Sequence, residues 1–319
     1  MTIPSSRPSL YSLFFISSVV FTSFPLISEA QTNPVVNGLS YSFYSKTCPN
    51  LETIVRNHLK NVFMEDNAQA AALLVVFFHD CFVQGCDASL LLDGNPSERD
   101  NPRNRGIRDK VLQIIDDIRA LSHKDCGRIV SCADITVLAA RDAVFLSGGP
   151  DYAVPLGRRD SINFSFEEAY NLPLPYNITD VTLETFASKN FDVSDVVALA
   201  GAHTIGRAHC HTFYNRLSPL DPNMDKTLAE ILNSTCPSTY SRNASDLDIR
   251  TPKRTKGLVE AFALNQTLFF EKFVDAFLKM SQLDVLMGDQ GEIRAKCNVI
   301  NDKKSIEMSF VDQIVQLTN

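Results

Sequence analysis

One segment, Phe77 to Ser89, constrains this chain more than any other part of its 319 residues. It continues an apolar run, Ala70 to Phe78, which has no polar face and therefore predicts a helix buried inside a domain. The segment then gathers a histidine, two aspartates, two cysteines, a glycine and a serine, namely His79, Asp80, Cys81, Gly85, Cys86, Asp87 and Ser89. This combination predicts a general base beside an oxygen-rich loop that a disulfide closes.

The loop after His79 has the composition of a calcium site. Side-chain oxygens come from two aspartates and a serine, and main-chain carbonyls are available around the tight turn that a glycine permits; the candidate ligands are Asp80, Val83, Gly85, Asp87 and Ser89. Calcium takes about 6–8 oxygen ligands, a number that this loop and water can supply. A lone histidine after an apolar run is more often structural, but these neighbours favour a catalytic role for His79.

The first 30 residues predict a cleaved secretory signal peptide, and residues 31–319 are long enough for one large domain or two small ones. No charge lies between Arg7 and Glu29, and the apolar stretch is short and interrupted by serines. No later stretch is long and apolar enough to cross a bilayer, so no membrane association is expected.

Eight cysteines in a secreted chain predict four disulfides, although the sequence alone leaves their pairing open. Sequons for N-glycosylation fit the same compartment and begin at Asn163, Asn177, Asn233, Asn243 and Asn265. A hydrophobic fraction of 45% and a charged fraction of 21% are typical of a globular protein. The net charge of −7 and the lack of a basic cluster argue against nucleic acid as a partner.

Apolar positions at helical spacing predict an all-α fold, because alternating strand patterns are scarce. Ser194 is available as the N-cap of one of these helices. The expected helices are Leu51–Met64, Ala70–Phe78, Val111–Leu121, Ser131–Leu146, Val181–Ser188, Ser194–Gly201 and Phe262–Met280.

A second histidine, His203, ends an apolar helix and is followed by Thr204. An imidazole at a buried helix end is a good axial ligand for haem iron. His209 and His211, with Cys210 between them, suggest a zinc site instead. We discount zinc because a step of six residues places His203 and His209 on different helical faces.

Five motifs occur in a fixed order along the chain. They are Phe78-His79-Asp80-Cys81-Phe82-Val83-Gln84-Gly85-Cys86-Asp87, Val130-Ser131-Cys132-Ala133-Asp134-Ile135, Gly157-Arg158-Arg159-Asp160, Asn171-Leu172-Pro173-Leu174-Pro175 and Leu199-Ala200-Gly201-Ala202-His203-Thr204-Ile205-Gly206. With these motifs, residues 41–300 resemble the secreted haem peroxidases of plants, the class III family.

The resemblance implies an all-α, two-lobed fold with haem b between a distal and a proximal lobe. His203 would be the axial ligand of the iron, and Phe78 would lie beside the haem. His79 would be the distal base, oriented by Glu98 and Asn104. Pro173 would lie at the mouth where phenolic donors bind.

The resemblance also implies two calcium sites and a disulfide pairing. The first calcium would be held by Asp80, Val83, Gly85, Asp87 and Ser89. The second would be incomplete, with Thr204, Asp248 and Thr251. The disulfides would be Cys48–Cys126, Cys81–Cys86, Cys132–Cys297 and Cys210–Cys236.

The chain departs from the family at Val75, where the family has an arginine four residues before the distal histidine. Positions four apart share a helix face, so that arginine and the histidine would flank the same peroxide. Loss of a comparable donor typically lowers a rate by about 10²–10³-fold. His79 therefore remains as the base, but the arginine cation that would assist it is absent.

A longer departure lies between Pro252 and Lys253, where a family segment is absent. That segment holds the aspartate that hydrogen-bonds the proximal histidine and the late ligands of the second calcium. Loss of such a partner commonly lowers affinity or activity about 10–100-fold. An omitted exon and genuine divergence both explain the absence.

The sequence thus predicts a secreted, monomeric, glycosylated haem peroxidase of the cell wall or vacuole. It would oxidise phenolic donors with hydrogen peroxide, in peroxide catabolism and the response to oxidative stress, at a rate that the two departures lower. The main alternative is a weak or inactive peroxidase-like protein that binds haem or the cell wall. A zinc hydrolase built on His203, His209 and His211 has little support.

Overall fold

The computed structural model describes residues 34–175, 177–222, 224–236 and 253–302. The predicted signal peptide, one sequon and two predicted ligands of the second calcium lie outside these residues: 1–30, Asn243, Asp248 and Thr251.

The all-α prediction is confirmed, because the described residues contain helices and only isolated β-bridges. None of the helices in this part of the chain has the length and hydropathy needed to span a membrane. The α-helices are α1 (Leu51–Glu65), α2 (Ala68–Val83), α3 (Asp109–Cys126), α4 (Cys132–Leu146), α5 (Thr179–Ala187), α6 (Val193–Ala200), α7 (Lys226–Thr235), α8 (Lys253–Leu264) and α9 (Gln266–Met280). The apolar pattern of the sequence predicted no helix at α7, and none before Phe262 in the region of α8.

Local capping explains where several helices begin, and it corrects two predictions. The Ser131 hydroxyl accepts a hydrogen bond from the Asp134 amide at 3.0 Å and starts α4. The N-cap of α6 is Asp192, whose carboxylate accepts from the Asp195 amide at 2.8 Å, and not Ser194. The predicted helix Phe262–Met280 is likewise wrong, since Asn265 ends α8 and caps α9 through the Leu268 amide.

Helix α2 extends further than its apolar run predicts. It continues to Val83, so His79 lies inside the helix and not at its end. The apolar run ends at Phe78, but the buried Phe82 and Val83 keep the helix packed against the core for another turn. Val75 and His79 are therefore one turn apart on an uninterrupted helix.

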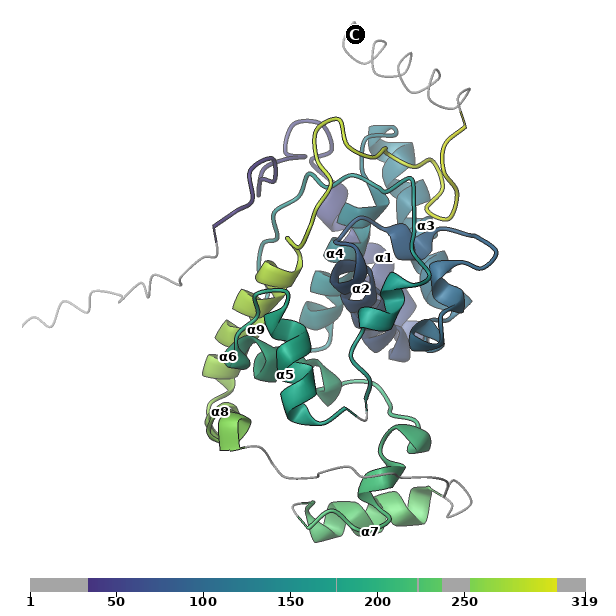
Figure 1. The fold of residues 1–319 in the computed structure, drawn as a ribbon. Coiled ribbons are helices and arrows are strands. Elements are labelled where there is room, and N and C mark those ends of the chain that lie inside the picture. The colour runs from purple at the N-terminus through teal and green to yellow at the C-terminus, as the bar shows by residue number, and fades with distance from the viewer. Residues whose placement is uncertain (1–33, 176, 223, 237–252, 303–319) are drawn as a thin grey trace, which may run out of the picture. The chain divides into compact units, whose positions relative to one another are not determined.

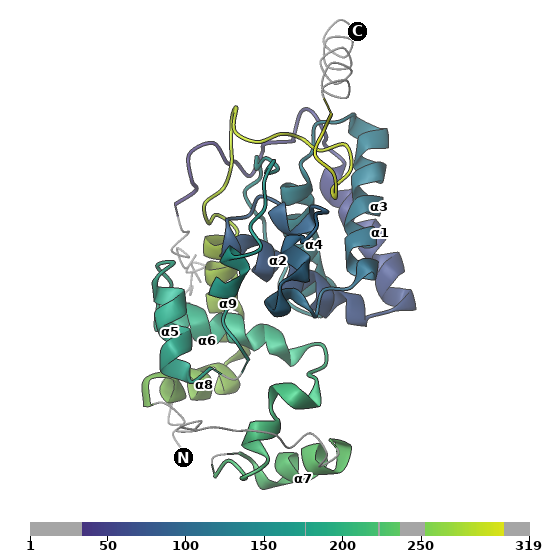
Figure 2. The same ribbon diagram turned by 45° about the vertical axis from the view of Figure 1, so that its right-hand side comes forward.

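The helices form two packed groups. Helices α1 to α4 contact one another, and α5, α8 and α9 pack around α6 (Figure 1). Helix α2 belongs to the first group and also contacts α9 of the second (Figure 2). It contacts the short 3₁₀ helix η5 (Gly201–Thr204) of the second group as well. The element that carries His79 thus lies against the element that carries His203.

Aromatic rings join α2 to the second group. Phe77 stacks on Phe277 of α9, with ring centroids 4.3 Å apart. Phe82 packs against Phe186 of α5 at 4.8 Å, and Phe78 stacks on the same ring at 5.9 Å. Aromatic pairs at these separations stabilise packing beyond the area that they bury.

The structure contains four disulfides, and they are the pairs that the resemblance implies. They are Cys48–Cys126, Cys81–Cys86, Cys132–Cys297 and Cys210–Cys236. The third spans 165 residues and ties the start of α4 to the segment that follows α9.

Candidate functional site

His79 is held by a hydrogen bond to Asn104 at the end of the 3₁₀ helix η3 (Pro102–Asn104). The imidazole Nδ1 lies 2.6 Å from the Asn104 Oδ1. The Asn104 amide nitrogen donates to the main-chain carbonyl of Glu98 at 2.8 Å, which leaves its oxygen as the acceptor. His79 therefore carries its proton on Nδ1, and Nε2 is free to accept another.

The surroundings of His79 keep it neutral. Burial lowers the pKa of the imidazole, while the hydrogen bond that the ring donates to Asn104 acts in the opposite direction. The Phe78 ring meets the imidazole edge-on, with centroids 5.6 Å apart. A neutral imidazole with a free Nε2 is a general base near pH 7.

Val75 places an apolar side chain on the face of α2 that carries His79. It is partly exposed, and it lies on the same uninterrupted helix. Residues four apart in a helix are neighbours on its surface. A cation at this position would stand beside whatever His79 deprotonates, and valine cannot take that role.

His203 lies in η5, directly after α6. Its side chain is exposed, which corrects the expectation of a buried helix end, and no described residue hydrogen-bonds to its ring. Thr204 beside it is exposed as well. Helix α6 is fixed to α9 by an ion pair of 2.7 Å between Asp195 and Lys279. His203 thus offers a free imidazole nitrogen directly after a helix that an ion pair ties to α9.

The loop after α2 folds around buried carboxylates. The Asp80 carboxylate accepts from the Ala88 amide at 2.9 Å and from the Leu90 amide at 3.3 Å. The Asp87 carboxylate accepts from the Ser89 amide at 2.9 Å. Asp80, Asp87 and Ser89 are all buried.

Gly85 is required for the turn of this loop. Its φ of +114° is disfavoured for other residues, and a Cβ there would collide with the Asp284 main-chain carbonyl. The neighbouring Cys86 amide donates to the Leu283 carbonyl at 3.1 Å. The loop is therefore held tightly against the segment that follows α9.

Three carboxyl groups of this region are buried. Burial raises the pKa of Asp80, Asp87 and Glu98. The charge of Asp87 raises the pKa of Asp80 and of Glu98 further, and the pKa of Glu98 reaches about 8. None of the three forms an ion pair with a described residue. Both Glu98 carboxylate oxygens and the Ser89 hydroxyl are buried without a hydrogen-bond partner. Buried carboxylates and an unpartnered hydroxyl fit a calcium ion well.

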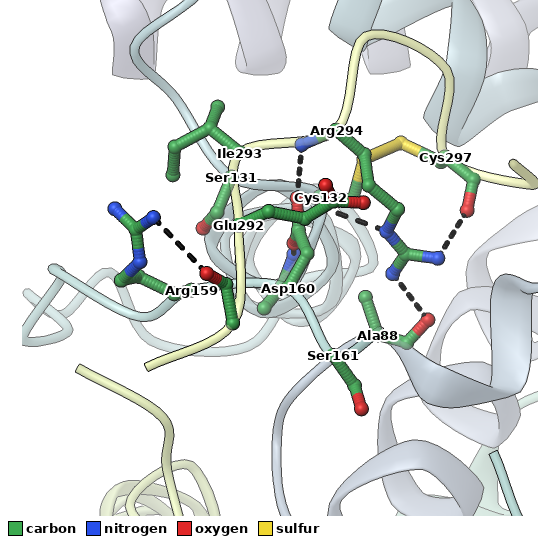
Figure 3. Close-up of polar contacts among 12 residues, drawn as sticks. Ala88, Ser131, Cys132, Arg159, Asp160, Ser161, Glu292, Ile293, Arg294 and Cys297 are labelled. Atoms are coloured by element: carbon green, nitrogen blue, oxygen red, sulfur yellow. Dashed lines mark hydrogen bonds and ion pairs between the residues drawn. A yellow bond between two sulfur atoms is a disulfide. The ribbon is translucent and has the colours of Figure 1, made fainter. Parts of the chain in front are cut away.

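Arg294, in the segment after α9, holds the same loop in place through hydrogen bonds. Its guanidinium donates to the Ala88 carbonyl at 2.5 Å and to the Cys297 carbonyl at 2.7 Å (Figure 3). Its amide donates to the Asp160 carboxylate at 2.9 Å. Sequence reasoning missed Arg294, and no local signal reveals it, because Ala88 and Arg294 are 206 residues apart.

Pro173 is half-buried and lines a cavity of about 480 Å³, to which His79 does not contribute. The zinc alternative loses a ligand, because Cys210 is in a disulfide with Cys236. Among the described residues, the one group of three possible metal ligands is Cys48, Asp125 and Cys126, and its cysteines are also disulfide-bonded.

We expect calcium to control the pH dependence of stability. Without calcium, a carboxyl group whose pKa is raised in the folded state contributes its full stabilisation at a pH below its unfolded pKa of about 4. This stabilisation is lost as the pH rises through the folded pKa, which is about 8 for Glu98. Bound calcium favours the ionised carboxylates and therefore removes this loss of stability at high pH. The gap in melting temperature between calcium and EDTA should therefore widen from pH 5 to pH 8.

The same experiment on Asp87→Asn should show a much smaller gap, and Asp87→Ala should lower thermal stability and haem retention together. Asp289→Asn is the matched control, because Asp289 is exposed and outside the loop. An identical response of the Asp87 and Asp289 variants would show that the loop does not hold the cation.

Comparisons with known proteins identify the family of this chain. The family model described as peroxidase matches residues 55–303. Peroxidase 12 of Arabidopsis thaliana is 44% identical over 325 aligned residues, covering 92% of this chain and 91% of the relative. Cationic peroxidase SPC4 of Sorghum bicolor is 41% identical (86% and 85% covered), and peroxidase N of Armoracia rusticana is 39% identical (82% and 91%). The chain therefore belongs to the peroxidase family, with the mainly α fold of the plant haem peroxidases.

Proposed function

We propose that this peroxidase oxidises small phenolic donors with hydrogen peroxide, with His79 as the base and His203 as the ligand of haem b. The observation that carries this proposal is the hydrogen-bonded chain from His79 through Asn104 to the Glu98 carbonyl. It directs the basic Nε2 away from Asn104 and keeps the imidazole in one tautomer.

The chain's own residues provide the proton chemistry. His79 Nε2 takes a proton from one oxygen of hydrogen peroxide and returns it to the other, which leaves as water. Asn104 holds the ring during both transfers, and the lowered pKa keeps the base unprotonated at neutral pH. A bound haem supplies the iron at which peroxide is reduced and phenols are oxidised. The free His203 ring fits the role of its axial ligand.

The protein as we propose it is a secreted, glycosylated monomer of the cell wall or vacuole. Residues 1–30 would be removed as a signal peptide, and residues 31–319 would form the mature domain. Calcium would occupy the loop of Asp80, Val83, Gly85, Asp87 and Ser89. A second calcium would have Thr204, Asp248 and Thr251 as an incomplete ligand set.

The test combines a spectrum with an assay. The purified protein should show a haem absorption band and a slow peroxide-dependent oxidation of guaiacol. His79→Leu should keep the haem and lose most of that activity, because the proton transfer has no other base. If the wild-type protein is no more active than His79→Leu, the result favours the non-catalytic alternative, a haem or cell-wall binding protein.

The lack of a hydrogen-bond partner for His203 should raise the reduction potential of the bound haem. No described residue accepts a hydrogen bond from His203, and the family's aspartate belongs to the absent segment. An anionic partner makes imidazole a stronger donor to ferric iron, so its loss favours the ferrous form. Redox titration should give a higher potential, and weaker haem retention, than in Arabidopsis peroxidase 12.

The matched control is a chimera that carries the corresponding segment of peroxidase 12 between Pro252 and Lys253. It should restore the lower potential. Equal potentials in the chain, the chimera and the relative would mean that another acid has replaced the aspartate.

A further inference from the structure

One of the N-glycosylation sequons lies in the wall of the cavity that Pro173 lines. Asn177, Ile178 and Thr179 form the sequon Asn-Ile-Thr, whose middle residue is not proline. Asn177 contributes to the lining of this cavity of about 480 Å³. In the part of the chain that the structure describes, no other sequon begins at a residue of that lining. A glycan on Asn177 would thus stand beside the cavity.

Asn177 lies between the floor of the cavity and its rim. Buried members of the lining, Phe82 and Leu172, form the floor, whereas Tyr170 and Ser188 are exposed and belong to the rim. Asn177 itself is half-buried. A glycan is bulky and polar and remains in water. It must therefore leave Asn177 through the open rim.

The side chain of Asn177 is available for modification. Its main-chain amide donates to the Leu174 carbonyl at 3.1 Å, whereas no described residue hydrogen-bonds to its side-chain amide. Thr179 is the first residue of α5, and Ile178 before it is exposed. The sequon thus lies at the surface just before a helix begins, which is the kind of position that N-glycans occupy.

We propose that Asn177 carries an N-linked glycan that limits this cavity to small ligands. The glycan would cover the rim near Tyr170 and Ser188. A single-ring molecule passes beside it, whereas a ring on a large or polymeric group collides with it, and such a clash is a means of specificity. That the admitted rings are electron donors rests on the proposed function. The enzyme would then oxidise free small phenols in preference to phenols that belong to a polymer.

The covalent step is the ordinary glycosyl transfer of the secretory compartment. The Nδ2 of Asn177 forms a bond to C1 of the first sugar and loses one proton. The bond between C1 and the diphosphate of a lipid-linked oligosaccharide breaks, and the lipid diphosphate leaves. Thr179 supplies the hydroxyl of the acceptor sequence. No oxidation or reduction is involved.

Mass spectrometry of the full chain produced in plant cells tests the modification. Trypsin leaves Asn163 and Asn177 on one peptide, because no Lys or Arg lies between Arg159 and Lys189. A second cleavage after Glu168 separates the two sequons. We expect Asn177 to be occupied, and a peptide found only in its unmodified form would overturn the proposal.

A binding measurement tests the effect of the glycan on the cavity. Ligand-observed NMR on the haem-loaded glycoprotein, without peroxide, compares guaiacol with guaiacol that bears a branched polyethylene glycol group. The wild type should bind the larger compound about tenfold more weakly than guaiacol, because the glycan obstructs it. Asn177→Gln and Thr179→Ala remove the sequon in different ways, and both should bring the two affinities together.

Asn233→Gln is the matched control, because it removes a sequon from an exposed position of α7 outside the cavity. It should keep the preference for the small compound. Melting temperatures identify variants that do not fold, and enzymatic removal of glycans from the wild type gives a measurement that needs no variant. Equal binding of the two compounds by the occupied wild type, or an equal change in Asn233→Gln, would overturn the proposal.

A peroxide assay with the same two compounds separates this inference from the proposed function. Size-selective binding without any oxidation would refute the enzyme and leave the role of the glycan standing. Oxidation of both compounds at equal rates by the occupied wild type would refute the role of the glycan and leave the enzyme standing.

Discussion

Replacing Val75 with arginine is expected to speed the reaction with hydrogen peroxide by about 10²–10³-fold. The variant places a guanidinium one helical turn from His79, on the same face of α2. Val75 is only partly buried, so the longer side chain has room to extend. The cation would stabilise negative charge on the leaving oxygen while His79 moves the proton. One such donor contributes about 2.7–4 kcal/mol in comparable sites.

Stopped-flow mixing with peroxide, followed in the haem absorption band, measures this rate directly. Val181→Arg is the control, because it adds the same charge at an exposed position of α5. It should leave the rate unchanged. If Val75→Arg holds haem normally and reacts no faster than Val181→Arg, then the block lies on the side of His203 and the absent segment.

Removing the Cys132–Cys297 disulfide is expected to lower the free energy of unfolding by about 5 kcal/mol in the chain-entropy description. The bond closes a loop with a sequence separation of 165, the longest of the four. Both sulfurs are buried, and the Cys297 amide donates to the Asp116 carboxylate at 3.0 Å. The disulfide therefore limits the unfolded chain and anchors the segment that carries Arg294.

Denaturant unfolding of the double variant Cys132→Ser/Cys297→Ser measures this loss. The comparison is Cys210→Ser/Cys236→Ser, which opens a separation of 26 residues and should cost about 3.5 kcal/mol by the same relation. A smaller effect from the long disulfide than from the short one would contradict the entropic argument. The Asp87 calcium response should also weaken in the first variant, because Arg294 holds Ala88.

Much of the distal site follows from local sequence. The apolar run before His79 predicts a buried helix, and the candidate calcium ligands after it are within a few residues of one another. The relation of Val75 to His79 is equally local, since helix geometry alone puts them on one face. Capping shows the limit of such reasoning. Asn265 is a good N-cap, but the apolar pattern on both sides of it predicted one helix where the structure has two.

The sequence by itself determined the all-α fold, the buried helix that carries His79 with the acidic loop after it, and the family, because helical periodicity and closely spaced motifs are properties of short segments. Only the tertiary structure decided that Glu98 orients Asn104 through its main-chain carbonyl. Every residue has such a carbonyl, so the sequence does not indicate which one accepts the hydrogen bond. The tertiary structure also brought Arg294 to Ala88, which lies 206 residues away in the sequence. Contacts between residues far apart in the chain depend on how the helices pack, and no short pattern encodes them.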